Sequence, residues 1–414
     1  MTVNPFFLII LIALILDFVL RLVASLLNLK VLKLELPPTL EGVYNPEDYR
    51  KSQEYTREST RFDIVAITFQ LLLLLSFWFA GGFNYLDQVV RAWGLVPLVS
   101  SLLYIGILLV AYSLLTLPFS VYATFVIEER FGFNRTTPRI FLLDRVKGLA
   151  LAVLLGAPLL VGILSFFEYS GPYAWLYCWL IITIFSLVMQ FVTPTWIMPL
   201  FNKFTPLESG KLKEAILNYA RSVNFPIKNV FVMDGSKRSS KSNAFFAGFG
   251  RNKRIALFDT LIEKHTVPEL VAVLAHEIGH HKRKHVLQGV IISILHTGVF
   301  LFLLSVFLGS PGLYQAFYVE QQSIYAGLLF FGLLYAPIEL LLSIVMQMLS
   351  RKNEYQADRF AAETIDEPQS LVDALKKLST SNLSNLAPHP FYVFLNYSHP
   401  PLLQRMRAIQ RYEA

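Results

Sequence analysis

Two histidines and a glutamate in this sequence have the spacing of a metal-binding helix. His276 and His280 are four residues apart, and Glu277 follows the first of them in the run HEIGH. Residues four apart on a helix project from nearly the same face, so both imidazoles can reach one metal ion. Glu277 is turned away by about a quarter turn, which suits a base that takes a proton from the attacking water. The motif therefore predicts a hydrolytic metal site on a helix.

Two other readings of this region need to be weighed. The same residues could form a solvated His/Glu face near a membrane, but the apolar run Leu270–Ala275 just before them favours the helix that the motif requires. His281 and His285 are also four residues apart, but Lys282 stands where the glutamate would be. We therefore assign this second pair to a basic cluster that flanks a membrane span, and not to the metal.

A third ligand is expected from another part of the chain, because catalytic zinc takes three protein ligands and keeps one position open. Glu354 and Asp358 share one helix face at a spacing of four. Glu354 can bind the metal while Asp358 orients a ligand histidine. If the helices continue into the neighbouring apolar spans, His280 and Glu354 lie about 9 Å and about 7.5 Å from the same membrane face.

Acyl-transfer chemistry also needs a donor for the oxyanion that forms beside the metal. The tail segment Ser398–Arg405 offers His399 and Arg405. Their spacing alone favours a surface loop, so the pair is a candidate only in combination with the other residues.

The composition indicates a polytopic membrane protein. Of 414 residues, 54% are hydrophobic and only 16% are charged, whereas a soluble domain has about 25% charged residues. A disordered chain and an ordinary soluble enzyme are excluded. Seven apolar stretches are long enough to cross a bilayer as helices. They are Pro5–Leu27, Ile64–Tyr85, Leu95–Phe125, Gly148–Phe167, Tyr173–Phe201, Val286–Leu308 and Ile324–Leu349.

The basic residues alternate between the loops and predict the orientation. The first, third and fifth connecting segments carry six, five and fifteen Lys and Arg residues, whereas the other loops carry one or none. Basic loops stay in the cytoplasm. We therefore expect the N-terminus outside and the metal site at the cytoplasmic face. The net charge of +7 is then a topology signal, and we expect no nucleic-acid partner.

The polar parts of the chain predict a small α+β unit joined to the bundle. We expect an amphipathic helix over Leu207–Asn224, strands at Asn229–Met233 and Arg254–Phe258, and an apolar edge strand within 242–248. The metal helix begins near Pro268 and runs on into the sixth span. The predicted parts are residues 1–201 (spans one to five), 202–285 (metallopeptidase segment), 286–349 (spans six and seven) and 350–414 (tail with the third ligand).

Together these features resemble the type I CAAX prenyl endopeptidases, which are integral-membrane zinc metalloproteases of the gluzincin type. The resemblance covers almost the whole chain. It rests on HExxH followed by ExxxD after a membrane hairpin, on HPPLLQR at 399–405, on ERFGFNRT at 129–136 and on SNAF at 242–245. It implies a mainly α-helical fold whose seven spans enclose a hollow chamber.

The resemblance also implies a role for each candidate residue. His276, His280 and Glu354 would bind one Zn²⁺ per chain, Glu277 would be the base and Asp358 an acid beside the metal. An edge strand with Asn243, Ala244 and Phe245 would bind an extended substrate, and His399 and Arg405 would line the site. The named reaction of the family removes the last three residues after a prenylated cysteine.

The sequence also supports expectations about the substrate, the location and the competing functions. We expect a monomer in the lipid bilayer that cleaves lipidated or other membrane-associated peptides. We expect a bacterial inner membrane, or the endoplasmic reticulum in a eukaryote. One alternative is a stress-type metalloprotease that degrades unprenylated membrane proteins, although that group generally has fewer spans. Another is a transporter or receptor with a structural metal, which leaves the pairing of HExxH with ExxxD unexplained.

Overall fold

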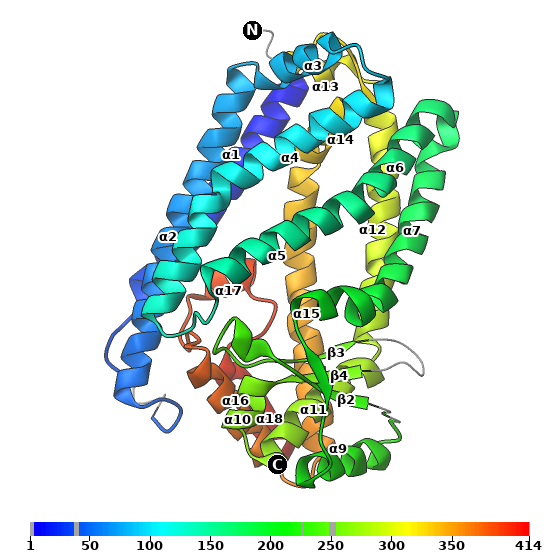
Figure 1. Ribbon diagram of the computed structural model, residues 1–414. Coiled ribbons are helices and arrows are strands. Elements are labelled where there is room, and N and C mark those ends of the chain that lie inside the picture. Colours follow the sequence, from blue (N-terminus) through cyan, green and yellow to red (C-terminus); the bar gives the residue numbers. More distant parts are fainter. Residues whose placement is uncertain (1–3, 37–40, 226, 228, 248–253, 414) are drawn as a thin grey trace.

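The computed structural model describes residues 4–36, 41–225, 227, 229–247 and 254–413, which form a tall helical bundle above a small α+β unit (Figure 1). Within these residues, six helical segments are long and apolar enough to cross a membrane, and a bent pair of helices makes a seventh if it is counted as one span. The predicted number of seven spans is reached only with that pair.

The bundle contains the following spans, given with their π-helical stretches. They are α1 (Pro5–Val31), α2 (Pro46–Phe79), α4 (Pro97–Tyr122) with η2 (Ala123–Glu128), α5 (Pro138–Leu151) with η3 (Ala152–Gly156) and α6 (Ala157–Tyr169), α7 (Ala174–Val192) with η5 (Thr193–Ile197) and α8 (Met198–Phe201), and α12 (His285–Phe307). The bent pair is α14 (Ile324–Leu334) and α15 (Ala336–Thr364), whose axes differ by 52°.

Local sequence signals explain where several spans begin and end. Asn4, Asn45 and Thr137 each cap a helix by accepting a hydrogen bond from the main chain three residues on, and a proline follows each of them. The second span ends at Phe79, before the predicted Tyr85. Gly81 has a φ of +71°, a left-handed conformation that favours glycine, and the separate helix α3 (Gly82–Ala92) starts after it.

A four-stranded sheet forms the centre of the α+β unit, in the order β1–β2–β4–β3. The strands are β1 (Phe204–Pro206), β2 (Asn229–Met233), β3 (Ala244–Ala247) and β4 (Arg254–Phe258). β2 and β4 are parallel, and the outer strands pair with them in antiparallel fashion. The two predicted strands are confirmed at both ends. β3 lies at the sheet edge as predicted, and position 248 lies outside the described residues.

Short helices cover the sheet and complete the tail. They are α9 (Lys211–Ser222), α10 (Asp259–Lys264), α11 (Val267–Lys282), α16 (Gln369–Ser381), α17 (Pro390–Asn396) and α18 (Leu402–Glu413). The short helix α13 (Pro311–Gln315) lies between α12 and α14 at the opposite end of the bundle (Figure 1). Ile216 of α9, Leu257 of β4 and Leu274 of α11 are fully buried in one apolar core. α9 is shorter than the predicted helix over Leu207–Asn224.

The loop after η2 docks on the segment that precedes β3. Asn134 and Ser239 form an antiparallel β-bridge. The main-chain N–H of Ser240 donates to the Phe133 carbonyl over 3.0 Å, and its hydroxyl donates to the Gly132 carbonyl over 2.8 Å. A loop of the membrane bundle thereby contacts the segment that leads into the edge strand β3.

The metal helix and the sixth span are two helices, and the prediction of one continuous helix is wrong. α11 ends at Lys282 and α12 starts at His285. Between them Lys284 has a φ of +61°, a left-handed conformation that is uncommon for a residue other than glycine. The estimated 9 Å between His280 and the membrane face assumed a continuous helix and does not apply.

Candidate metal centre

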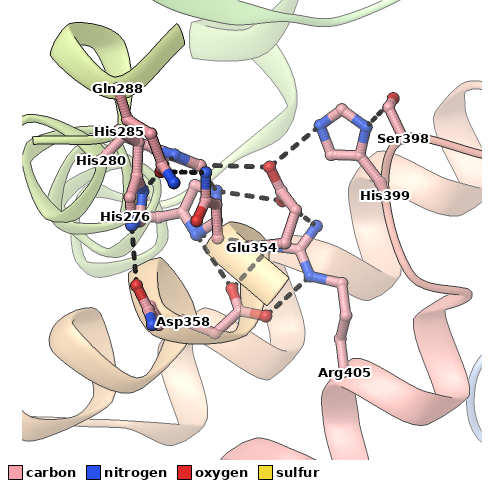
Figure 2. Close-up of polar contacts among 11 residues, drawn as sticks. His276, His280, His285, Gln288, Glu354, Asp358, Ser398, His399 and Arg405 are labelled. Atoms are coloured by element: carbon pink, nitrogen blue, oxygen red, sulfur yellow. Dashed lines mark hydrogen bonds and ion pairs between the residues drawn. The ribbon is translucent and has the colours of Figure 1, made fainter. Parts of the chain in front are cut away.

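Three side chains from α11 and α15 meet in one compact cluster (Figure 2). His276 Nε2 and His280 Nε2 are 3.1 Å apart. Glu354 places Oε2 3.4 Å from the first of these nitrogens and Oε1 3.2 Å from the second. The structure thus brings together the residues that the two sequence motifs predict as ligands.

The spacing and chemistry of this cluster fit a tetrahedral metal ion. Two ligand nitrogens about 2.0–2.1 Å from zinc are roughly 3.3 Å apart in tetrahedral geometry, close to the observed separations. Glu354 is buried, and its Oε2 accepts no hydrogen bond from the described residues. A buried carboxylate oxygen beside two imidazole nitrogens is a suitable metal ligand.

Close packing of α11 against α15 holds the two halves of the cluster together. A Cβ atom on Gly279 would lie 3.1 Å from both the Cα and the carbonyl oxygen of Ala357. Those neighbours are backbone atoms and cannot swing aside. Glycine at this position therefore lets the helix that carries His276 and His280 approach the helix that carries Glu354.

Asp358 and Arg405 form a buried ion pair behind His276. Asp358 Oδ1 lies 2.9 Å from His276 Nδ1, and Arg405 donates to both carboxylate oxygens of Asp358. Arg405 also places Nη1 3.5 Å from Glu354 Oε2. Spacing alone favoured a surface loop for Arg405, but the structure buries it at the start of α18, in contact with the cluster.

These contacts shift the protonation of the buried groups. Burial alone would lower the pKa of His276, but the carboxylates of Asp358 and Glu354 outweigh it and raise its pKa to about 9. Burial alone would raise the pKa of Asp358, whereas Arg405 and His276 hold that pKa below its usual range. Asp358 is therefore an anion that accepts a hydrogen bond from the Nδ1 side of His276.

A cavity of about 540 Å³ opens at the cluster. Glu277 lies in its wall with His276 and Glu354, and burial raises the pKa of Glu277 above its usual range. The exposed His399 borders the same cavity, with Nε2 3.3 Å from Glu354 Oε1 and Nδ1 2.8 Å from the hydroxyl of Ser398.

The free edge of the sheet reaches this cavity. Asn243 and Ala244 line it, as the substrate-strand prediction requires, whereas Phe245 is not among the lining residues and packs its ring against Phe258. Ser242, just before the strand, exchanges two main-chain hydrogen bonds with the side-chain amide of Asn382 at 3.0 and 3.1 Å. The strand is therefore fixed where it enters the cavity wall.

The structure also shows a residue that the sequence analysis missed. His285 is buried, and its Nδ1 lies 3.1 Å from His280 Nδ1. The sequence predicted that His285 flanks a membrane span and does not bind the metal; it is not in the ligand cluster, but its contact with His280 was not predicted. His281 is not part of the metal cluster, and its ring packs against Phe225. Only the helix break at Lys284 places His285 there, and no glycine in the sequence signals that break.

The family of the chain follows from comparison with known proteins. The model described as "CAAX prenyl protease N-terminal, five membrane helices" matches residues 25–203, and that of "Peptidase family M48" matches residues 206–413, which include every residue of the cluster. The chain belongs to peptidase family M48. It is a multi-pass membrane metalloendopeptidase, and the enzyme class predicted from HExxH and ExxxD is confirmed.

Curated relatives and a solved structure agree with this membership. The chain is 39% identical to "CAAX prenyl protease 1 homolog" of Arabidopsis thaliana, and the match covers 93% of both chains. It is 36% identical to "CAAX prenyl protease 1" of Saccharomyces cerevisiae, over 92% of this chain and 89% of the relative. The crystal structure of S. mikatae Ste24p superposes with a TM-score of 0.93 at 34% identity and covers 98% of this chain and 99% of its own.

Proposed function

We propose that this metallopeptidase uses one zinc ion, bound by His276, His280 and Glu354, to cleave peptides at the cytoplasmic membrane face. The observation that carries the proposal is the cluster of these three side chains beside a cavity that His276, Glu354, Glu277 and the sheet edge line. Zinc at this site would supply the Lewis acidity that activates water and polarises a peptide carbonyl.

The residues around the cluster have separate tasks. Glu277 takes the proton of the attacking water and passes it to the leaving amine. Asp358 orients His276 through Nδ1 and keeps its Nε2 directed at Glu354. His399 and Arg405, which both contact Glu354, supply donors for the developing oxyanion.

The substrate binds as an added strand. β3 has a free edge, and the main chain of Ala244 holds an extended peptide across the cavity, next to Asn243, whose own carbonyl accepts from the Phe258 N–H within the sheet. The peptide is a prenylated CAAX terminus from which three residues are removed; the relatives are named CAAX prenyl proteases. Phe245 supports this strand from the far side by packing on Phe258.

The protein works as a monomer in the bilayer, with its N-terminus outside and its metal centre in the cytoplasm. The host membrane is a bacterial inner membrane, or the endoplasmic reticulum in a eukaryote. We assign residues 1–201 and 286–349 to the membrane bundle, around a chamber that faces the metal. Residues 202–285 and 350–414 provide the two halves of the centre.

The deciding experiment compares Glu277→Gln with the wild type on a farnesylated CAAX peptide and its unlipidated twin, with products mapped by mass spectrometry. We expect the variant to keep stoichiometric zinc and to lose cleavage. Unchanged turnover in the variant would refute the role of Glu277. Cleavage of an unfolded membrane protein but of neither peptide would favour the stress-type protease instead.

A further inference from the structure

A buried imidazole next to the ligand set has no role in the mechanism above. His285 at the start of α12 places Nδ1 3.1 Å from His280 Nδ1 and Nε2 2.9 Å from Gln356 Oε1. Its side chain therefore lies between the ligand helix α11 and the ligand helix α15. We propose that His285, held by Gln356, is a positioning residue that fixes the ring of His280 for metal binding.

The hydrogen positions along this chain of contacts follow from the ligand chemistry. His280 directs Nε2 at His276 and Glu354, so this nitrogen must be free of hydrogen to bind a metal. Its Nδ1 then carries the hydrogen and donates it to His285 Nδ1. The remaining hydrogen of His285 is on Nε2, where it donates to Gln356 Oε1. In this series of contacts from His280 through His285 to Gln356, each nitrogen and oxygen is either a donor or an acceptor, with no conflict.

The helix break provides the geometry for this contact. In a continuous helix, residue 285 would lie roughly 140° around the axis from His280 and would point away from it. Lys284 instead takes a φ of +61°, which a lysine adopts only under constraint, and the chain turns so that His285 faces back to His280. An unfavourable backbone conformation is thus found where it serves the centre.

The two ligand histidines consequently have matching supports on one helix. Asp358 of α15 contacts His276 Nδ1, and Gln356 of the same helix reaches His280 through His285. Groups that orient a ligand histidine are typically worth about 10- to 100-fold in metal affinity. The second support is neutral, so it fixes the tautomer of His280 without a further negative charge.

The inference rests on the proposed zinc site, and the test distinguishes a failure of the inference from a failure of that proposed site. Zinc affinity of the full-length protein in detergent is measured by competition with a fluorescent chelator, and the melting temperature of the zinc-free protein reports folding. We expect His285→Leu to bind zinc about 10- to 100-fold more weakly. His285→Asn, whose Oδ1 takes the place of Nδ1, stays within about threefold of the wild type. His281→Leu is the matched control and keeps wild-type affinity.

A second pair of variants covers the case in which His285→Leu does not fold. Gln356→Leu removes the acceptor for His285 Nε2 and should weaken zinc binding about tenfold. Gln356→Glu keeps an acceptor oxygen there and should bind zinc with wild-type affinity. Wild-type affinity in both leucine variants would overturn the inference, as would equal loss in His285→Asn and His285→Leu. A wild type that binds no zinc would overturn the proposed function instead.

Discussion

Arg405 donates two parallel hydrogen bonds to Asp358, with Nη2 2.6 Å from Oδ1 and Nε 2.8 Å from Oδ2. Both side chains are buried, and Asp358 in turn contacts His276. This geometry joins α18 to the ligand helix α15. The tail of the chain thereby contacts the candidate metal centre.

Loss of the guanidinium is expected to damage both stability and activity. Arg405→Ala leaves the buried Asp358 carboxylate with His276 alone beside it, which costs about 3 kcal/mol or more. Arg405→Lys keeps the positive charge but cannot donate two parallel hydrogen bonds to Asp358. Its melting temperature and turnover should therefore lie between those of the wild type and of Arg405→Ala. Melting temperature and peptide turnover are the measurements. Arg407→Ala, at an exposed position of the same helix, is the control and should change neither.

Gly279 gives a steric prediction. Gly279→Ala forces α11 away from the Ala357 backbone and should cost about 1–3 kcal/mol while lowering zinc affinity. Gly289→Ala is the control, because no atom lies within 4 Å of its added Cβ and alanine favours a helix. Melting and chelator competition on both variants test this. Equal melting temperatures and zinc affinities in the two variants would show that the close contact between α11 and α15 does not determine zinc binding.

Substitution of Lys241 is expected to weaken substrate binding without changing zinc affinity. Its ammonium group donates to Tyr55 and Glu128 at 2.9 and 3.0 Å and lies 4.4 Å from the ring centre of Phe133. These contacts hold the segment that leads to β3. Lys241→Met should raise the KM for the peptide several-fold at unchanged zinc affinity. Lys237→Met, at an exposed position, should leave KM unaltered, and a loss confined to kcat would contradict the assignment.

Glu269, at the start of the metal helix, should make the stability of the protein depend on pH. Burial alone would raise the pKa of Glu269, but Lys377 and the N–H of Thr266 outweigh it and hold the pKa below its usual range. The resulting stability is complete above the ordinary glutamate pKa and is lost as the pH falls through the lowered one. Glu269→Gln should therefore have a melting temperature that depends less on pH in acid. Glu263→Gln, at an exposed position, should follow the wild type.

Local patterns were sufficient for much of this molecule. Short segments separated by turn-forming residues predicted β2 and β4 at their observed ends, and the spacing of four predicted that Glu354 and Asp358 share a face. The break at Lys284 was not predictable, because a left-handed lysine carries no local signal and is imposed by contacts with distant residues. The burial of Arg405 likewise depends on Asp358, which lies on another helix.

The origin of the ligands has a consequence for the making of this enzyme. His276 and His280 precede the last membrane hairpin, whereas Glu354 follows it on α15. During synthesis the histidines leave the ribosome first, and a chain that lacks α15 has only two of the three proposed ligands. With the zinc site proposed above, a nascent chain would gain its third ligand, and with it proteolytic activity, only after the final hairpin has been made.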